Sequence, residues 1–203
     1  MIIINEVIKM DNIINSFLEE QNLCISKIQH DTKTLEKIIE ILITARDKKK
    51  KIFVMGNGGS GSTASHLVSD LLKTAITKGD ERFSAISLVD NIPVILAWSN
   101  DSNFNNIFSE QIKNHVSKGD VLIGFSGSGR SQNVLNAFTV GKKNGSICIG
   151  ITGMGGGKFP KICDVCFTVP SNDMLMIESI HVTLCHCIVS SIRHKGKPLF
   201  TYE

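Results

Sequence analysis

Two patterns of hydrophobic and polar positions divide the chain near residue 50. Over residues 6–49, apolar side chains recur every three or four positions, as at Ile38 and Leu42, which predicts two amphipathic helices. Beyond residue 50, short apolar runs rich in β-branched residues alternate with helical segments. We expect a helical hairpin over residues 1–50 and a second unit over residues 51–203. No linker rich in Pro and Gly separates them, so we expect them to pack together.

The second unit alternates strands with helices. The expected strands span residues 52–55, 83–88, 121–125, 146–152 and 165–169. The expected helices span residues 62–77, 92–98, 103–116, 131–143 and 173–194. The strands lack the polar alternation of a half-exposed sheet, and strand–helix alternation is typical of a parallel sheet covered on both faces. We therefore predict an α/β fold, with a doubly wound parallel five-stranded sheet preceded by the helical hairpin.

Composition indicates neither a polymeric partner nor export. The 203 residues carry 22 Lys and Arg against 19 Asp and Glu, a formal net charge of +3, which is too balanced to indicate nucleic acid or an anionic membrane. The basic run Lys48–Lys51 is expected to be the solvated end of a helix. The apolar start Met1–Ile4 is interrupted by Asn5 and Glu6, and no stretch reaches about 18 apolar residues. We expect no signal peptide, no transmembrane helix and a cytoplasmic location, in which the six cysteines are reduced, buried thiols.

Glycine and serine crowd two loops that each follow a strand and open a helix. The first loop, Gly56–Gly61, satisfies the G-x-G-x-x-G pattern of dinucleotide-binding proteins. The acidic residues about 20 positions further on, Asp80 and Glu81, precede the next strand, whereas a ribose-binding acid belongs at the far end of that strand. We therefore expect no nucleotide cofactor.

The second loop, Ser126–Ser131, favours a phosphate ligand. It brings the hydroxyls of Ser126, Ser128 and Ser131 and several backbone N–H groups to a helix N-terminus, where unpaired amides and the helix dipole attract anions. The alternative is that the glycines and serines only form a tight turn and a helix cap. Two such loops at the carboxyl ends of parallel strands indicate one shared ligand crevice.

Two helices carry side chains suited to proton transfer or metal binding. His66 and Asp70 are four residues apart on one helix, and Glu178 and His186 are eight apart on the last helix, so each pair shares a face. If all four side chains converge within about 5 Å of one point, they serve either a metal such as zinc or an acid–base reaction. The alternative is that these helices pack with polar residues at their edges.

Two further features are expected to be structural. His181 is a lone histidine on the last helix. Cys163 and Cys166 lie in a strand-like run without a second cysteine pair, and strand alternation places their thiols on opposite faces, which disfavours a metal or redox site.

The motifs, taken in order, resemble the sugar isomerase (SIS) domain family, and most closely its phosphoheptose isomerase branch. The matching segments are Gly56–Ser60, Ser99–Asp101, Phe104–Phe108, Gly119–Gly124, Ser126–Ser131, Ile151–Gly153, Gly155–Gly157 and Val169–Ser171. The resemblance covers nearly the whole chain. It implies a flavodoxin-like SIS fold and interconversion of sedoheptulose 7-phosphate and D-glycero-D-manno-heptose 7-phosphate on the way to surface heptose. It also implies a homotetramer with active sites between subunits, and one zinc or other divalent metal per subunit.

The resemblance further implies roles for individual residues. Asp70 would be the catalytic base and His186 the acid of a proton transfer through an enediol. The implied metal ligands are His66, Asp70, Glu178 and His186. Asn100 and Asp101 are expected on a loop. The implied substrate contacts are Asn57, Gly58, Gly59, Ser60, Asp70, Asn100, Asp101, Ser126, Gly127, Ser128, Ser131 and Glu178.

The chain departs from the usual family pattern mainly at the expected sugar end. The departures are Asp70 for Glu, Glu178 for Gln, Gly127 for Thr, Arg130 for Asn, and Met174 and Met176 for polar residues. They leave open an isomerase of a different sugar phosphate, and a reaction in which Glu178 is the base. The other alternative is a non-catalytic SIS protein that binds a phosphosugar or a replication initiator, which His186 disfavours.

Overall fold

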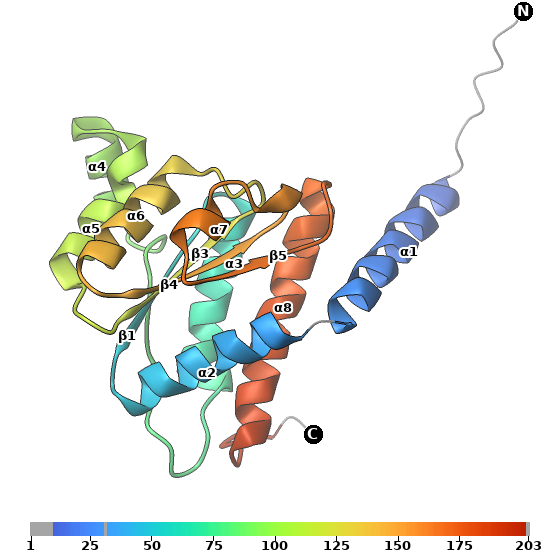
Figure 1. Ribbon diagram of the computed structural model, residues 1–203, viewed down its shortest axis with the longest axis horizontal. Helices are drawn as coiled ribbons and strands as arrows, with labels where there is room; N and C mark the ends of the chain where they lie inside the picture. The colour runs from blue at the N-terminus through green and yellow to red at the C-terminus, as the bar shows by residue number, and fades with distance from the viewer. Residues whose placement is uncertain (1–9, 31, 202–203) are drawn as a thin grey trace, which may run out of the picture.

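Five parallel strands form one sheet in the order β2-β1-β3-β4-β5, the order of flavodoxin-like folds. The computed structural model describes residues 10–30 and 32–201. The strands are β1 (Lys51–Met55), β2 (Ser84–Ser87), β3 (Val121–Ser126), β4 (Ile147–Thr152) and β5 (Val165–Thr168). In the central register, Ile52 lies opposite Val121, and Val121 opposite Ile147. The predicted doubly wound sheet is confirmed (Figure 1).

The helices follow the predicted alternation, with three differences. They are α1 (Met10–Gln29), α2 (Lys33–Asp47), α3 (Gly59–Ser69), α4 (Ile92–Asp101), α5 (Ile107–His115), α6 (Gln132–Lys143), α7 (Phe159–Ile162) and α8 (Met174–Lys195). First, α3 begins inside the glycine loop and ends in a π-helical turn, η1 (Asp70–Thr74), instead of running to residue 77. Second, α4 is longer than predicted. Third, α7 has only four residues, too few to show a periodicity.

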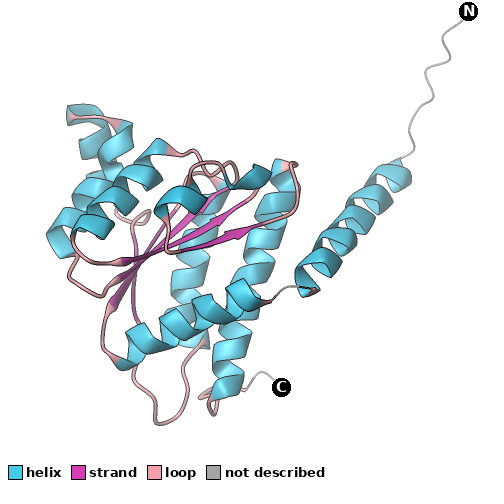
Figure 2. Ribbon diagram, in the orientation of Figure 1, coloured by secondary structure: helices cyan, strands magenta, loops and turns pink. Residues whose placement is uncertain are grey.

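The two faces of the sheet bury separate apolar cores. On β1, Ile52 and Val54 face the core formed with α2, α3 and α8, whereas Phe53 and Met55 face the core formed with α5, α6 and α7. Figure 2 shows helices on both sides of the strands. Because both faces are covered, the central positions of β1, β3 and β4 are apolar or glycine on both faces, which explains the missing polar alternation.

The two N-terminal helices pack to different extents. α2 buries Ile38 and Leu42 completely in the core beside α8. α1 extends away from the sheet (Figure 1) and buries only Cys24 among its residues. Its exposed large apolar side chains are Met10, Ile13, Ile14, Leu18 and Leu23. The apolar start Met1–Ile4 and the predicted helical residues 6–9 lie outside the described residues.

The last helix, α8, is a core element of the fold. Its buried side chains include Ile180, Leu184 and Ile188. Among the described residues it is the one helix long and apolar enough, by length and composition, to cross a membrane, although polar residues such as Glu178 and His186 interrupt it and it contains no run of 18 apolar residues. Half of the apolar window is buried inside the protein, as in the core helix of a soluble protein, which makes it weak evidence for a membrane span.

Candidate active site

The first loop leaves β1 in a conformation that glycine favours and is tied to the second half of the sheet. Gly58 has a φ of 53° and precedes α3, a backbone region that other residues rarely adopt. Asn57 exchanges two amide–amide hydrogen bonds, of 3.0 and 2.8 Å, with Asn133 in the first turn of α6. Asn133 is only 1% exposed. This pair joins the two loops across β1 and β3, where the strand order reverses and α/β proteins bind ligands.

Sequence reasoning missed Asn133. Its only signal was a polar side chain two positions after Ser131, at the start of an expected helix. Asn133 positions Asn57 through the two paired hydrogen bonds. Because Asn57 lies 76 positions away in the sequence, the residues around Asn133 gave no sign of this role.

The second loop has the geometry of an anion site. The hydroxyls of Ser126 and Ser131 lie 2.9 Å apart. Ser131 makes no side-chain cap on α6, which leaves the N–H groups of Gln132 and Asn133 available to a ligand, whereas the Val134 N–H donates to Asn133 Oδ1 at 2.9 Å. The loop is braced from behind, because the Lys158 N–H donates to the Gly129 carbonyl at 2.8 Å. Gly129 has a φ of 60°.

Met174 packs onto this loop at the place where Gly127 lacks a side chain. A Cβ built on Gly127 would fall on the Met174 sulfur and 3.1 Å from its Cε. Two departures from the family pattern are therefore one structural feature, since the missing side chain at 127 makes the space that Met174 occupies.

The carboxylate of Glu178 lies over the first loop. A Cβ built on Gly59 would fall 2.6 Å from Glu178 Oε1. Gly59 is the first residue of α3, and the helix dipole favours a negative charge at that end. Glu178 thus belongs with the glycine loop, at the carboxyl edge of the sheet.

His66, Asp70 and His186 converge where α3 and α8 lie side by side. The Nε2 atoms of the two histidines are 2.8 Å apart. Asp70 Oδ2 lies 3.4 Å from His66 Nε2 and 3.9 Å from His186 Nε2. The Asp70 side chain is 15% exposed, whereas those of His66 and His186 are 44% and 59% exposed. Asp70 begins the π-helical turn η1, a distortion that is frequent at functional sites.

The three donor atoms fit a metal ion. Their separations of 2.8, 3.4 and 3.9 Å average close to the edge of about 3.3 Å expected for a tetrahedron with ligands at 2.0–2.1 Å. Two imidazoles and one carboxylate are also a common donor set of catalytic zinc. The described residues contain one such group of metal-ligating side chains, and it is this one.

Glu178 does not join this cluster within one chain. It precedes His186 by eight residues on α8, which corresponds to about 12 Å along the helix axis. The expectation that all four side chains converge is therefore met for His66, Asp70 and His186 but not for Glu178. The helical spacing correctly placed Glu178 and His186 near one face of α8. It did not bring them to the same position along the helix axis, and for that reason they do not share one site within the chain.

Other expected substrate contacts lie elsewhere. Asn100 and Asp101 form the last turn of α4 and not a loop, and the Asn100 amide donates to the Asp101 carboxylate at 2.7 Å. The loop placement was wrong because α4 runs through Ser99 to Asp101; a substrate role for these two residues stays a prediction. Ser60 is 5% exposed, beneath the exposed Gly58 and Gly59.

Two cavities adjoin these groups. One, of about 370 Å³, lies beside the first loop, and its walls include Asn57, Gly58, Ser62 and Asp90. The other, of about 290 Å³, opens against Asp70 and His186.

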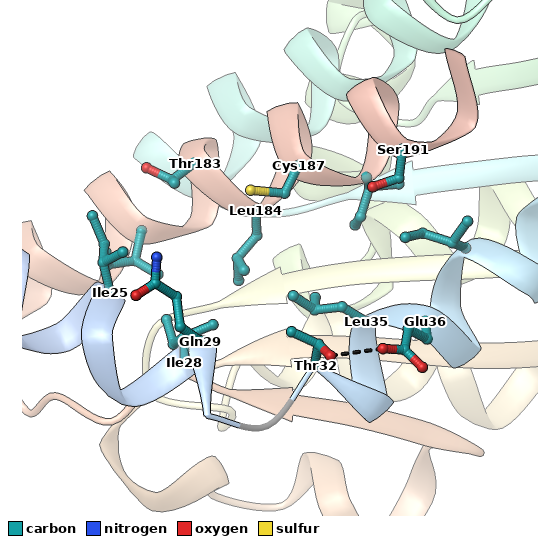
Figure 3. Close-up of a pocket in the computed structure, with 13 residues that line it drawn as sticks. Ile25, Ile28, Gln29, Thr32, Leu35, Glu36, Thr183, Leu184, Cys187 and Ser191 are labelled. Carbon is teal, nitrogen blue, oxygen red and sulfur yellow. Dashed lines mark hydrogen bonds between the residues drawn. The ribbon is translucent and has the colours of Figure 1, made fainter. Parts of the chain in front are cut away.

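A third cavity, of about 390 Å³, is mostly apolar and lies between α1, α2 and α8 (Figure 3). Its walls include Ile25, Leu35 and Leu184, and its one carboxylate, Glu36, accepts a hydrogen bond of 2.6 Å from Thr32 (Figure 3). It has no acid–base pair, so it is not a candidate for the chemistry.

His181, Cys163 and Cys166, the residues expected to be structural, are at least half-buried. His181 is fully buried beside Phe125. All six cysteines are free thiols; three are buried, Cys163 and Cys166 are half-buried, and Cys187 is exposed, against the expectation that all are buried. Burial raises the pKa of the Cys163 and Cys166 thiols, which lowers their reactivity.

The chain is similar to known proteins in sequence and in fold. The family model described as "SIS domain" matches residues 16–153. A phosphoheptose isomerase of Aliarcobacter butzleri is 36% identical over 187 residues, which cover 90% of this chain and 98% of that protein. A phosphoheptose isomerase of Geotalea daltonii is 40% identical over 152 residues, covering 74% and 78% of the two chains. The solved structure of a phosphoheptose isomerase from Francisella tularensis superposes with a TM-score of 0.87 at 25% identity, covering 92% of this chain and 100% of that one.

Proposed function

The chain belongs to the SIS domain family, in its phosphoheptose isomerase branch, and from this premise we propose the reaction it catalyses. It is an aldose–ketose isomerase of a sugar phosphate, and its reaction is the interconversion of sedoheptulose 7-phosphate and D-glycero-D-manno-heptose 7-phosphate, in the cytoplasm, for surface heptose. The observation that carries the proposal is the carboxylate–imidazole cluster of Asp70 and His186 in a chain that also has an anion-binding serine loop.

The cluster supplies the two groups that the reaction needs. Isomerisation moves a proton between C1 and C2 through an enediol, so one group removes a carbon-bound proton and another protonates an oxygen. Asp70 is the base, because a carboxylate accepts a proton and this one is mostly shielded from water. His186 is the acid, since its more exposed imidazole can donate at the carbonyl oxygen.

The serine loop holds the phosphate. Ser126, Ser128 and Ser131, with the N–H groups at the start of α6, bind its oxygens, and this remote binding energy orients the sugar. Asn57 and Gly58 line the cavity beside the first loop, and together with Gly59 they contact the sugar chain.

His66, Asp70 and His186 would hold a zinc or other divalent ion, and their donor separations support this assignment. A bound zinc would act as a Lewis acid on a carbonyl oxygen. Without an ion, both side chains keep their proton-transfer roles beside the same cavity; with an ion bound, Asp70 would keep one free carboxylate oxygen, whereas His186 Nε2 would be a ligand and could not also carry the proton.

The dimensions of α8 favour an active site shared between subunits. Met174, which touches the phosphate loop, precedes His186 by twelve residues, or about 18 Å along the axis. A seven-carbon sugar phosphate reaches about 9 Å from phosphorus to C1. A sugar held by one chain's loop therefore needs the Asp70–His186 cluster of a neighbouring subunit, and Glu178 of the loop-bearing chain completes that site.

The proposed assembly is a homotetramer. The exposed apolar side chains of α1, such as Ile13, Ile14 and Leu18, support a role for this helix in association. The mostly apolar cavity beside α8 supports the same role (Figure 3).

A second candidate is an isomerase of a different sugar phosphate. Met174 gives the crevice an apolar wall where the family usually has a polar contact, and it is the observation that favours this candidate. A non-catalytic phosphosugar-binding protein has less support, because binding alone requires neither Asp70 nor His186.

Steady-state kinetics with ketose phosphates of five, six and seven carbons test the proposal. We expect the seven-carbon substrate to have the highest kcat/KM, and His186→Ala to lower kcat by about a hundredfold or more without loss of ligand-induced thermal stabilisation. Preference for a shorter ketose phosphate would support the second candidate. Stabilisation by ligand without any turnover would support the binding protein.

A further inference from the structure

A basic cavity lies at the end of the sheet opposite the glycine and serine loops. It measures about 710 Å³ and is bounded by α2 and by the first residues of β3 and β4, Val121 and Ile147. The serine loop begins at the other end of β3, at Ser126, five residues or about 17 Å away. The cavity is therefore separate from the proposed active site, and the inference below does not depend on the proposed function.

Four lysines and one carboxylate line this cavity. The lysines are Lys37, Lys48, Lys50 and Lys118, and the carboxylate is that of Glu40. Within residues 10–30 and 32–201, none of the four lysines has a carboxylate oxygen within 4.0 Å. Like charges held close together repel, so this arrangement favours an anion between them.

The fold holds part of this charge in place. The Lys50 ammonium donates to the Lys118 carbonyl at 3.0 Å. Gly119 has a φ of 86°. Because it has no side chain, the Lys50 side chain can pass close to it; a Cβ at position 119 would lie 3.1 Å from Lys50 Cε. Lys50 is thus anchored at the mouth of the cavity and retains two of its three N–H donors for a ligand.

The basic run Lys48–Lys51 is more than the solvated helix end that the sequence predicts. Lys48 and Lys50 line the cavity. Lys49 pairs with Glu81 at 3.1 Å, and Lys51 donates to the His115 carbonyl at 3.0 Å. Two of the four lysines in the run, Lys48 and Lys50, therefore line the cavity together with Lys118, and the other two have partners elsewhere.

The remaining wall is apolar, with one hydroxyl. The partly exposed Ile41 and Ile147 provide the apolar surface, with the buried Ala45 and Val121 behind them, and Thr44 provides the hydroxyl. The volume lies within the range of about 300–1,000 Å³ typical of small-molecule sites. Inorganic phosphate would fill little of it and leave the apolar wall uncovered.

We propose that this cavity binds an organic polyphosphate of the nucleoside diphosphate class. Its phosphates pair with Lys48, Lys50 and Lys118, and its nucleoside covers the partly exposed Ile41 and Ile147. Because the cavity and the serine loop lie at opposite ends of β3, this ligand and a sugar phosphate bind at the same time.

Isothermal titration calorimetry of the full chain with ADP, in the presence of a chelator, tests the proposal. We expect saturable binding that weakens as salt is added. Lys48→Ala with Lys118→Ala should weaken it by about tenfold or more. The arginine pair Lys48→Arg with Lys118→Arg should retain binding, which separates loss of charge from loss of fold. The matched control is Lys143→Ala with Lys161→Ala, two exposed lysines outside the cavity, which should change the affinity by less than about twofold.

Three results would overturn the proposal. The first is no binding of ADP. The second is equal affinity in the wild type and the Lys48/Lys118 alanine variant, which would place ADP at the serine loop. The third is equal affinity for inorganic pyrophosphate and ADP, which would show that the apolar wall contributes nothing.

Discussion

Acidification should destabilise the fold through His181, a buried imidazole that takes no part in the chemistry. The residue is 0% exposed, and its ring lies 5.6 Å from the Phe125 ring. Among the residues that the structure describes, neither ring nitrogen has a hydrogen-bond partner of normal geometry. Burial lowers the pKa of His181 from 6.5 to about 4, and the Thr152 backbone opposes this shift only in part.

The sign and size of the effect follow from that pKa. The unfolded chain binds a proton at His181 below about pH 6.5, whereas the folded chain does so only near pH 4. Stability is therefore complete above pH 6.5 and falls as the pH drops toward 4. The difference of about 2.5 pH units, at about 1.4 kcal/mol each, corresponds to a loss of about 3.5 kcal/mol of unfolding free energy.

Urea unfolding at fixed protein concentration, in steps of about one pH unit from about 7.5 to 4.5, measures this loss. The comparison is with His181→Met, which fills the site without a titratable group. The stability difference between the two proteins should change by about 1.4 kcal/mol per pH unit below pH 6.5. His194→Asn, at an exposed histidine, should follow the wild type. Parallel curves for the wild type and His181→Met would refute the reasoning, because they would mean that His181 titrates normally in the folded state.

Three further predictions concern the site. Gly127→Ala should lower stability by about 1–3 kcal/mol, seen as a lower melting temperature, and should cost little in a Met174→Ala background; equal costs in both backgrounds would contradict the contact. His66→Ala should reduce bound zinc, measured by elemental analysis, from about one per chain to near zero; unchanged zinc would exclude the cluster as the metal site. Mixed oligomers of an inactive Asp70→Asn chain and a chain with an inactive loop, Ser126→Ala, should regain activity if each site spans two subunits; no recovery in verified mixed oligomers would place the site within one chain.

The parallel sheet was predictable from the sequence because burial on both faces leaves a direct mark. The apolar runs of β1 and β3 carry no polar alternation, and only a sheet covered on both sides permits that. The pairing of His66 with Asp70 was equally local, since a spacing of four residues brings side chains together in any α-helix.

Relations in space between distant segments were not predictable in this way. Helical spacing placed Glu178 and His186 near one face of α8, but the partner of each depends on how α8 lies along α3. Asn57 and Asn133 are 76 positions apart, and their pairing depends on the order of β1 and β3 in the sheet. The fit of Met174 to Gly127 likewise depends on how the start of α8 packs on the serine loop, which neither segment reveals by itself.

Nuclear magnetic resonance of sedoheptulose 7-phosphate incubated with the protein in heavy water tests the central claim most directly. An enediol mechanism exchanges the transferred proton with solvent at the Asp70 carboxylate. The account predicts an aldoheptose 7-phosphate that carries deuterium at C2, formed by the wild type and not by Asp70→Asn. No aldose from the wild type, or an aldose formed equally by Asp70→Asn, would contradict it.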